Sequence, residues 1–468
     1  MDIFDVLTLI GGLCLFLFGM NLMGDALERS AGSKLEMMIG KLTSGKMAGL
    51  LTGLGVTAVI QSSSATTVMV VGFVNSKLMT LKQAIHVIMG ANIGTTVTAW
   101  ILSLSGISGS NTFLKLLKPT SFTPVLALIG IIFAMFTKSN KKKDIGVILL
   151  GFATLMFGMD TMTDAVSGLK DIPAFQEMFI MFKNPVLGVL VGAVLTAVIQ
   201  SSSASVGILQ ALAATGAVSF GAAIPIIMGQ NIGTCITALL SSVGTTKNAR
   251  RAALVHLSFN VIGTVVCLGA FSIVKAVFAP SLLDESATYA GIATAHSLFN
   301  VACTLLLLPM SGLLEKLAYK LIPDNEQKEK ASKLDERLLV TPAIALECAR
   351  NLTCDMAELA TTALKSSIEC LSGFDKAKAK YVREIEDKTD RLEDTIGTYL
   401  IKLSTKQLNE NEGAMASMLL KAIGDFERIS DHAVNIIESA EEMQEKGIVF
   451  SEGAEAEMEA LSNATTEI

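Results

Sequence analysis

One stretch of this 468-residue chain occurs twice, and that duplication constrains the fold more than any other feature. The run Thr-Ala-Val-Ile-Gln-Ser-Ser-Ser-Ala fills positions 57–65 and recurs unchanged at 196–204, a shift of 139 positions. The same shift, without a gap, superimposes three more runs: Phe18-Gly19-Met20 on Phe157-Gly158-Met159, Asp25-Ala26 on Asp164-Ala165, and the Gly-x-Asn-Ile-Gly-Thr of 90–95 on that of 229–234. A fixed period predicts two copies of one structural unit.

Long apolar windows indicate that most of both copies lies in a membrane. Apolar residues make up 51% of the chain and charged residues only 17%. A helix needs about 20 apolar residues to cross the ~30 Å hydrocarbon core. Full spans are predicted near 5–24, 84–105, 122–137, 145–167, 220–243, 251–278 and 289–316.

Two further apolar stretches, 47–76 and 186–218, are interrupted in the middle by Gln-Ser-Ser-Ser. A simple lipid-facing helix has no reason to carry such a polar run. Non-helical backbone at membrane depth is tolerated only where protein or a water-filled cavity surrounds it. We therefore predict two re-entrant helical hairpins that line a pathway.

The number of crossings predicts that the second copy is inverted, because each copy holds three spans and one hairpin that enters and leaves on the same side. The positive-inside rule then sets the orientation. It makes three basic clusters cytoplasmic: Lys141–Lys143; Lys247, Arg250 and Arg251; Lys328, Lys330 and Lys333. We expect a multi-pass protein of the cell (inner) membrane. Its N-terminus is external, the first hairpin opens to the cytoplasm and the second opens to the outside.

The expected fold class is all-α, a polytopic membrane protein with two inverted repeats, each containing a re-entrant helical hairpin, and a cytoplasmic helical bundle. The membrane domain covers 1–320, with repeat 1 at about 5–137, repeat 2 at about 145–278 and a final span at 289–316. From 321 to 468 apolar residues recur at helical spacing among charged ones. This second domain ends at Ile468 in a helical region that looks incomplete. The seven cysteines show no Cys-x-x-Cys spacing, so neither a disulfide framework nor a zinc site is predicted.

The predicted pathway must recognise its substrate with neutral groups. The hairpins and the spans at 84–105 and 220–243 contain no Lys, Arg, Asp or Glu. Serine hydroxyls and free backbone N–H groups at a break between half-helices bind anions, aided by the positive end of the helix dipole. This chemistry suits a small tetrahedral oxyanion.

The same segments offer oxygen atoms for a hard cation. They come from Gln61, Gln200, Asn92, Asn231, Thr95 and Thr234. Without a fixed positive charge, an anion in a low-dielectric site is strongly disfavoured unless cations enter with it. We therefore expect the protein to take up its anion together with cations. Inverted repeats with broken elements are typical of secondary transporters, which bind substrate near the bilayer midplane.

Packing explains other small and polar residues. Gly49-x-x-x-Gly53 and its copy Gly188-x-x-x-Gly192 are assigned to close helix contact. The carboxylates Asp25, Asp160 and Asp164, near span ends, are interpreted as interfacial or packing groups.

A His-x-x-Phe-Asn-Val run occurs at 256–261 and again at 296–301, in the last two predicted spans. It places His256 and Asn260 on one helix face, and likewise His296 and Asn300. Intramembrane histidines can form a proton relay. We favour the alternative, in which these two antiparallel helices hydrogen-bond to each other.

The paired Gln-Ser-Ser-Ser runs, each followed some thirty residues later by Gly-x-Asn-Ile-Gly-Thr, resemble the type II sodium-phosphate cotransporters over about 1–320. The chain is similar to the compact bacterial branch, since it lacks the large cysteine-containing loop of the animal members. The resemblance implies that sodium drives inorganic phosphate inward by alternating access, and that the two hairpins meet at the substrate site. It also implies the site residues. These are Gln61, Ser62, Ser63, Ser64, Gln200, Ser201, Ser202 and Ser203, with Thr66, Asn92, Thr95, Ser205, Asn231 and Thr234 in second rank.

The region after 320 resembles the phosphate-uptake regulator PhoU in its Glu/Asp-x-x-x-Asp motifs, which place two carboxylates one turn apart. Converging carboxylates of this kind can hold a di- or trivalent metal. The candidate ligands are Glu386, Asp390, Glu427 and Asp431. A solvated acidic helix face is the alternative. A regulatory role is expected, in which the bundle senses phosphate status or docks phosphate-signalling proteins.

Other function classes fit less well. A membrane enzyme with a serine nucleophile and a histidine base needs its nucleophile once, whereas an alternating site needs a pair. A membrane-anchored phosphate-status sensor needs no hydroxyl-rich hairpins. Transport of another oxyanion is kept as an alternative function. A homodimer is plausible by analogy, and no nucleic-acid partner is expected.

Overall fold

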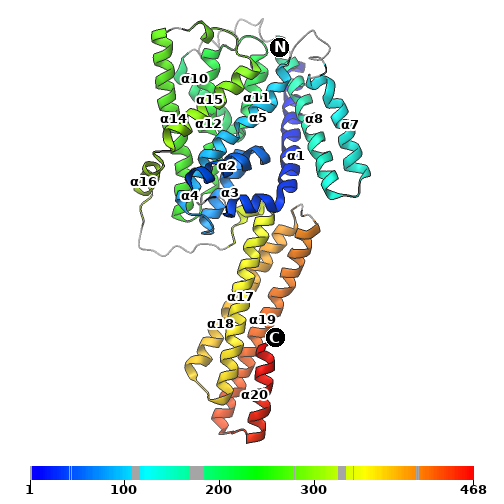
Figure 1. Cartoon of the computed structure of the whole chain (residues 1–468), viewed down its shortest axis with the longest axis vertical. Coiled ribbons are helices and arrows are strands. Elements are labelled where there is room, and N and C mark those ends of the chain that lie inside the picture. Colours follow the sequence, from blue (N-terminus) through cyan, green and yellow to red (C-terminus); the bar gives the residue numbers. More distant parts are fainter. Residues whose placement is uncertain are drawn as a thin grey trace. The chain divides into compact units, whose positions relative to one another are not determined.

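The computed structural model describes residues 3–41, 43, 45–107, 116, 118–168, 184–278, 280–324, 334–340, 342–406, 408 and 410–467. Within these residues the chain is helical and contains no strand, so the all-α class is confirmed (Figure 1). The basic cluster Lys328, Lys330 and Lys333 lies outside the described residues. The chain divides into two compact units, Met1–Ser332 and Lys333–Ile468.

Seven helical segments among the described residues are long and apolar enough to span a membrane, and each overlaps a predicted span. They are α1 (Ile3–Lys41), α4 (Leu81–Gly94) with α5 (Thr96–Ser103), α7 (Pro119–Phe136), α8 (Asn140–Val166), α12 (Phe220–Gly233) with α13 (Cys235–Ser241), α14 (Lys247–Phe278) and α15 (Tyr289–Leu307). The predicted hairpins contain shorter helices: α2 (Lys46–Ile60) and α3 (Ser63–Asn75), then α10 (Pro185–Ile199) and α11 (Ser202–Ala213).

The last predicted span, 289–316, is wrong at its end. α15 stops at Leu307, and a separate helix, α16 (Ser311–Leu321), follows it. Pro309 explains the break, because proline lacks the N–H that would continue the helical hydrogen bonds beyond Leu308.

Arg251, predicted as part of a cytoplasmic basic cluster, holds the far end of α16. Its guanidinium donates to the Ile322 carbonyl at 2.9 and 2.6 Å and to Asp324 Oδ1 at 2.6 Å. It also lies over the Tyr319 ring, 3.9 Å from the centroid. The residue is thereby 1% exposed although its side chain carries a full charge. Burial of this kind needs such complete pairing.

Both copies pack a hairpin helix against a broken span through glycines. A Cβ at Gly53 would lie 1.9 Å from Val87 O, and a Cβ at Gly192 would lie 2.1 Å from Ile226 O, which is 139 positions further on. The backbones of α2 and α4, and of α10 and α12, therefore approach too closely for a side chain. Close packing, predicted for the Gly-x-x-x-Gly motifs, is confirmed at these two glycines.

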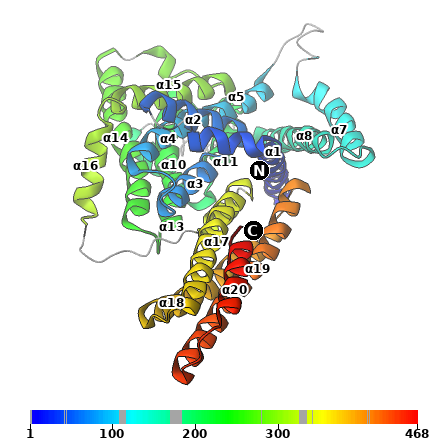
Figure 2. The ribbon, with the colours of Figure 1, turned by 60° about the horizontal axis from the view of Figure 1, so that its bottom comes forward.

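α1 and α8 occupy corresponding places in the two copies and lie side by side (Figures 1 and 2). A Cβ at Gly12 would lie 3.1 Å from Gly158 O, and a Cβ at Gly19 would lie 2.6 Å from Gly151 O. Rising numbers on α1 meet falling numbers on α8, so the helices are antiparallel. Under the shift of 139, Gly12 corresponds to Gly151 and Gly19 corresponds to Gly158, so each of these two contacts is the counterpart of the other. This is the pattern expected of an inverted duplication.

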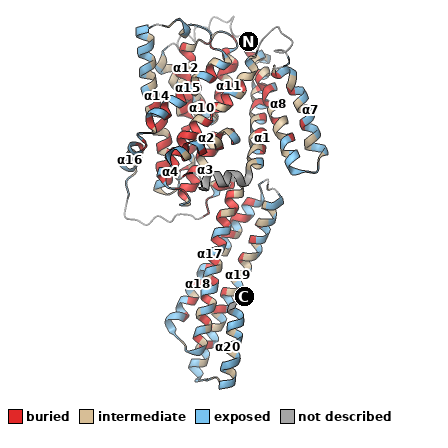
Figure 3. Ribbon diagram, in the orientation of Figure 1, coloured by how far each residue is buried: buried red, intermediate tan, exposed pale blue. Residues whose placement is uncertain are grey.

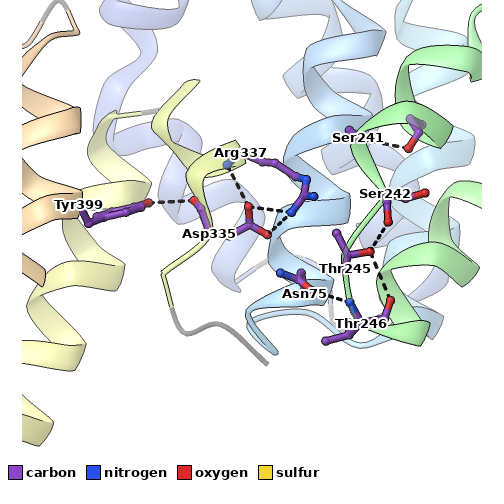
Figure 4. A network of polar contacts seen from close by, with 9 residues as sticks. Asn75, Ser241, Ser242, Thr245, Thr246, Asp335, Arg337 and Tyr399 are labelled. Carbon is purple, nitrogen blue, oxygen red and sulfur yellow. Dashed lines mark hydrogen bonds and ion pairs between the residues drawn. The ribbon is translucent and has the colours of Figure 1, made fainter. Parts of the chain in front are cut away.

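The C-terminal unit contains α17 (Pro342–Ser372), α18 (Lys376–Ser404), α19 (Glu410–Lys446) and α20 (Glu452–Glu467). Apolar residues such as Val382 and Ile437 form a buried core between these helices. Figure 3 shows buried positions in red along the ribbons of this unit. The short helix η4 (Glu336–Val340) precedes them. Tyr399 Oη on α18 donates to Asp335 O at 3.1 Å, and the Asp335 carboxylate pairs with Arg337 at 3.0 Å (Figure 4). These contacts fix η4 to the bundle.

Candidate transport site

Each hairpin is a helix broken at the same dipeptide. Gln61 and Ser62 separate α2 from α3, and Gln200 and Ser201 separate α10 from α11. Both glutamines have left-handed backbone, with φ of 61° and 59°. This conformation is uncommon for residues other than glycine and costs about 1–3 kcal/mol. The same strain in both copies marks the breaks as the centre of the site.

The serines after each break cap the second half-helix. Ser62 Oγ accepts a hydrogen bond from Ala65 N at 3.1 Å, and Ser201 Oγ accepts one from Ala204 N at 3.2 Å. The first N–H groups of α3 and α11 have no partner within the helix, as in every α-helix. They lie at its positive end, where an anion is stabilised. The carbonyl groups at the C-terminal ends of α2 and α10 carry the partial negative charge of the helix dipole.

Paired hydroxyls join the arms of each hairpin. Thr57 Oγ1 donates to Thr66 Oγ1 at 3.0 Å, and Thr66 Oγ1 in turn donates to Ser62 O at 3.0 Å. In the second copy Thr196 Oγ1 donates to Ser205 Oγ at 2.8 Å. Thr66 and Ser205, predicted as second-rank site residues, thus support the shape of the hairpin.

The Asn-Ile-Gly-Thr runs mark a second pair of breaks. Two spans predicted as continuous, 84–105 and 220–243, are interrupted at Thr95 and Thr234. Thr95 Oγ1 donates to Ala91 O at 3.0 Å and Thr234 Oγ1 donates to Gln230 O at 2.9 Å. Such hydrogen bonds to the preceding turn often bend helices.

The two hairpin tips differ in their surroundings. Gln61 is 5% exposed, and its Oε1 accepts a hydrogen bond from Thr98 Oγ1 on α5 at 3.1 Å. Gln200 is exposed. Thr237, the counterpart of Thr98, instead donates to Thr234 O within its own helix at 3.0 Å. Identical sequences therefore adopt two arrangements in one molecule.

The copies interlock through their second halves. α3 of the first hairpin contacts α13, and α11 of the second hairpin contacts α5. Asn75 at the end of α3 accepts a hydrogen bond from Thr246 N at 2.9 Å (Figure 4). Among the described residues no hydrogen bond joins the two tips themselves. Most predicted site residues are buried. They are Gln61, Ser63, Thr66, Asn92, Thr95, Ser202, Ser203, Ser205, Asn231 and Thr234, while Ser62, Ser64 and Ser201 are half-buried.

The favoured interpretation of the repeated His-x-x-Phe-Asn run was wrong. Asn260 Nδ2 donates to His256 O and Asn300 Nδ2 donates to His296 O, both at 3.0 Å and both within one helix. His256 Nε2 instead lies 3.4 Å from Asn92 Oδ1 on α4. The sequence pattern singled out the motif but not its partner, because the partner comes from the other copy.

Sequence reasoning also missed Thr98. The sequence does contain a signal for this residue, because the threonine recurs in both copies. Thr98 corresponds to Thr237 under the shift of 139, and both lie three residues after the threonine of a Gly-Thr break. A threonine within an apolar helix is common, however, and only the structure shows that its hydroxyl contacts Gln61.

The predicted metal ligands lie on neighbouring helices, Glu386 and Asp390 on α18 and Glu427 and Asp431 on α19. Burial, and then the nearby Asp431 carboxylate, raises the pKa of Glu427. Burial and then Asp387 raise the pKa of Glu386. Yet nowhere in the described part of the chain do three or more His, Cys, Asp or Glu side chains form a group that could hold a metal ion. Metal binding stays a prediction.

A duplicated membrane domain with broken helices around neutral, hydroxyl-rich tips defines the class of membrane transport proteins. The chain belongs to the Na+/Pi-cotransporter family, whose model matches residues 15–164 and 174–285, and it carries a PhoU domain that matches 353–440. It is therefore an integral membrane protein of a phosphate transporter family.

Individual relatives cover different parts of the chain. The Salmonella typhimurium protein named "Putative inorganic phosphate export protein YjbB" is 26% identical over 97% of this chain and 82% of its own length. Protein YqeW of Bacillus subtilis is 31% identical over 66% of this chain and 95% of its own length. The human sodium-dependent phosphate transport protein 2B is 38% identical over 26% of this chain and 19% of its own length. No solved structure matches the chain at a significant level.

Proposed function

We propose that this protein is a sodium-coupled carrier of inorganic phosphate that works by alternating access. Phosphate and sodium bind between the tips Gln61–Ser64 and Gln200–Ser203. The observation that carries the proposal is the duplicated broken helix, with left-handed glutamine and capping serine at the same place in both copies.

Each break offers complementary groups for the two solutes. Free N–H groups and hydroxyls at the start of α3 and α11 stabilise the phosphate oxygens. Carbonyl and amide oxygens at the end of α2 and α10 are the ligands that sodium prefers. Because no fixed positive side chain is provided, co-bound sodium supplies the countercharge.

Alternating access fits the asymmetry between the copies. The inverted arrangement lets one hairpin govern access from the cytoplasm and the other from outside. Such a carrier adopts states in which its two equivalent halves differ. Gln61, docked on Thr98, and Gln200, exposed, correspond to such a difference.

Direction follows from the gradients. A symporter runs whichever way the combined sodium and phosphate gradients drive it, so an inward sodium gradient produces import. The relative named as an exporter makes efflux a necessary second measurement.

The test is uptake of labelled phosphate by proteoliposomes under an inward sodium gradient, compared with an equal potassium gradient. We expect uptake with sodium only. Ser63→Ala and Ser202→Ala should each reduce it about tenfold or more, because a hydrogen bond to a charged group contributes about 1.5–3 kcal/mol. Exposed Ser281→Ala is the control and should transport normally. Folded wild-type protein without sodium-dependent flux in either direction refutes the proposal.

The C-terminal unit is proposed to regulate the carrier. A chain truncated after residue 324 should still transport phosphate while losing its response to phosphate status. Loss of all flux from this correctly inserted variant favours the second candidate function, a membrane-anchored sensor.

A further inference from the structure

We propose that His256 gives the two equivalent asparagines of the site different tasks, so that Asn92 presents its amide N–H groups to phosphate and Asn231 presents its carbonyl oxygen to sodium. The inference rests on the proposed function and assigns its two ligands to particular atoms. Asn92 and Asn231 occupy the same position of the repeat, in the Gly-x-Asn-Ile-Gly-Thr runs.

The orientation of the Asn92 amide follows from its contact with His256. Asn92 is 3% exposed, and its Oδ1 lies 3.4 Å from His256 Nε2. An amide oxygen can only accept, so Nε2 carries the hydrogen and donates it. Oδ1 thus accepts one hydrogen bond, and Nδ2, with both of its hydrogens, is buried without a partner. A buried donor without a partner in a native protein calls for an explanation, and an oxyanion in the site provides one.

Asn231 has the opposite arrangement. Its Nδ2 donates to Ile227 O one turn earlier, at 2.9 Å, and the residue is 5% exposed. Its Oδ1 accepts no hydrogen bond among the described residues, while Nδ2 already gives one of its two hydrogens to Ile227 O. The equivalent carbonyl in the first copy is that of Ile88, which Asn92 Nδ2 does not use. Asn92 therefore has both amide hydrogens without a partner, whereas Asn231 has its carbonyl oxygen without a hydrogen bond among the described residues.

The difference comes from the neighbour that each asparagine meets. His256 lies on α14, which packs against α4 of the first copy and brings its imidazole to Asn92. Among the described residues no histidine hydrogen-bonds to the Asn231 amide, which bonds within its own helix instead.

The chemical consequence is that two residues of the same type, Asn92 and Asn231, bind two different solutes, phosphate and sodium. Amide N–H groups suit phosphate oxygens, whereas an amide carbonyl suits a hard cation. His256 touches neither solute in this account and is a positioning residue.

The test measures phosphate uptake by proteoliposomes and determines two half-saturation constants. One is for phosphate at saturating sodium, and the other is for sodium at saturating phosphate. His256→Leu should raise the phosphate constant about tenfold, the effect of one hydrogen bond to a charged group, and leave the sodium constant within about twofold. His256→Gln, whose amide can still donate to Asn92, should restore much of the phosphate affinity. Equal shifts in both constants, or a shift in neither, overturn the inference.

A second pair of variants guards against loss of folding. Asn92→Asp keeps the acceptor for His256 but removes the free donor, and should abolish phosphate binding. Asn231→Asp keeps an oxygen ligand and should retain sodium activation. Phosphate affinity that survives in Asn92→Asp overturns the inference. Wild-type protein is measured first, because absence of sodium-dependent flux there refutes the proposed function itself and this assignment with it.

Discussion

Two glutamines with identical neighbours in the sequence make different contacts in the folded protein. Gln61 is buried and accepts a hydrogen bond from Thr98, whereas Gln200 is exposed. Asn92 and Asn231 are both buried but also differ in their hydrogen-bond partners, His256 for the first and Ile227 O for the second. At the scale of single residues, two copies of one motif have different hydrogen-bond partners, and the proposed function makes use of this difference.

Replacement of Thr98 by valine should release Gln61 while preserving side-chain shape. A buried amide oxygen that loses its donor costs about 1–3 kcal/mol. We expect a lower melting temperature and a several-fold rise in the sodium half-saturation constant. Thr237→Val is the matched control, because its hydroxyl bonds only to its own helix. Equal effects of the two substitutions contradict a specific role for the Thr98–Gln61 contact.

The pKa of Glu427, raised mainly by burial, predicts a pH-dependent effect in the C-terminal unit. A raised pKa means that the ionised carboxylate destabilises the fold. This penalty is absent once the pH falls below the pKa that the carboxyl has in the unfolded chain, because the group is then protonated in both states. Glu427→Gln should therefore stabilise α19 at pH 7 by less than about 1 kcal/mol, since the group is partly solvated.

Hydrogen exchange of the full-length protein provides the measurement. Protection of α19 should increase in Glu427→Gln at pH 7, and the difference should vanish below about pH 4 after correction for the intrinsic exchange rate. Glu438→Gln, at an exposed position of the same helix, is the control. Stabilisation that persists in acid contradicts the electrostatic explanation.

Helix contacts in the membrane unit depend on backbone approach. Glycines bring α2 against α4, α10 against α12 and α1 against α8 with no room for a side chain. Apolar burial alone does not favour protein over lipid for a membrane helix, so close van der Waals packing supplies the attraction. The broken elements are thus fixed by their neighbours rather than by their own apolar character.

Gly53→Ala should separate α2 from α4, because the new Cβ would overlap Val87 O. Overpacking of this kind costs about 1–3 kcal/mol or more. We expect a lower melting temperature in detergent and loss of phosphate flux. Gly11→Ala adds the same methyl group at a place on α1 where no atom of a neighbouring helix lies within 4 Å and should have little effect. Comparable damage from both would show that helix flexibility, not contact, is responsible.

At the scale of the whole molecule, the proposed topology places the N-terminal ends of the second, fourth and sixth crossings, α4, α8 and α14, in the cytoplasm. The loop before α8 is then internal and the loop after α14 is external. In a cysteine-free background, Ser139→Cys should react with a membrane-impermeant reagent only from the cytoplasmic side. Ser281→Cys should react only from outside, and both positions are exposed. Labelling of both from one side refutes the inverted arrangement.

The sequence by itself determined the fold class, the number of spans, the duplication and the positions of both hairpin breaks. These properties are local or periodic: apolar length sets a span, and a polar run with capping serines sets a break. The end of α15 was misplaced although Pro309 marked it, because a long apolar window outweighed one proline.

Only the tertiary structure decided which atoms of the site face one another. The contact of His256 with Asn92 joins residues 164 positions apart, and that of Thr98 with Gln61 joins residues 37 apart. Neither follows from spacing along a helix, because each depends on how helices from different parts of the chain pack. A duplicated sequence predicts two equal sites, but packing against unlike neighbours makes the two copies chemically different.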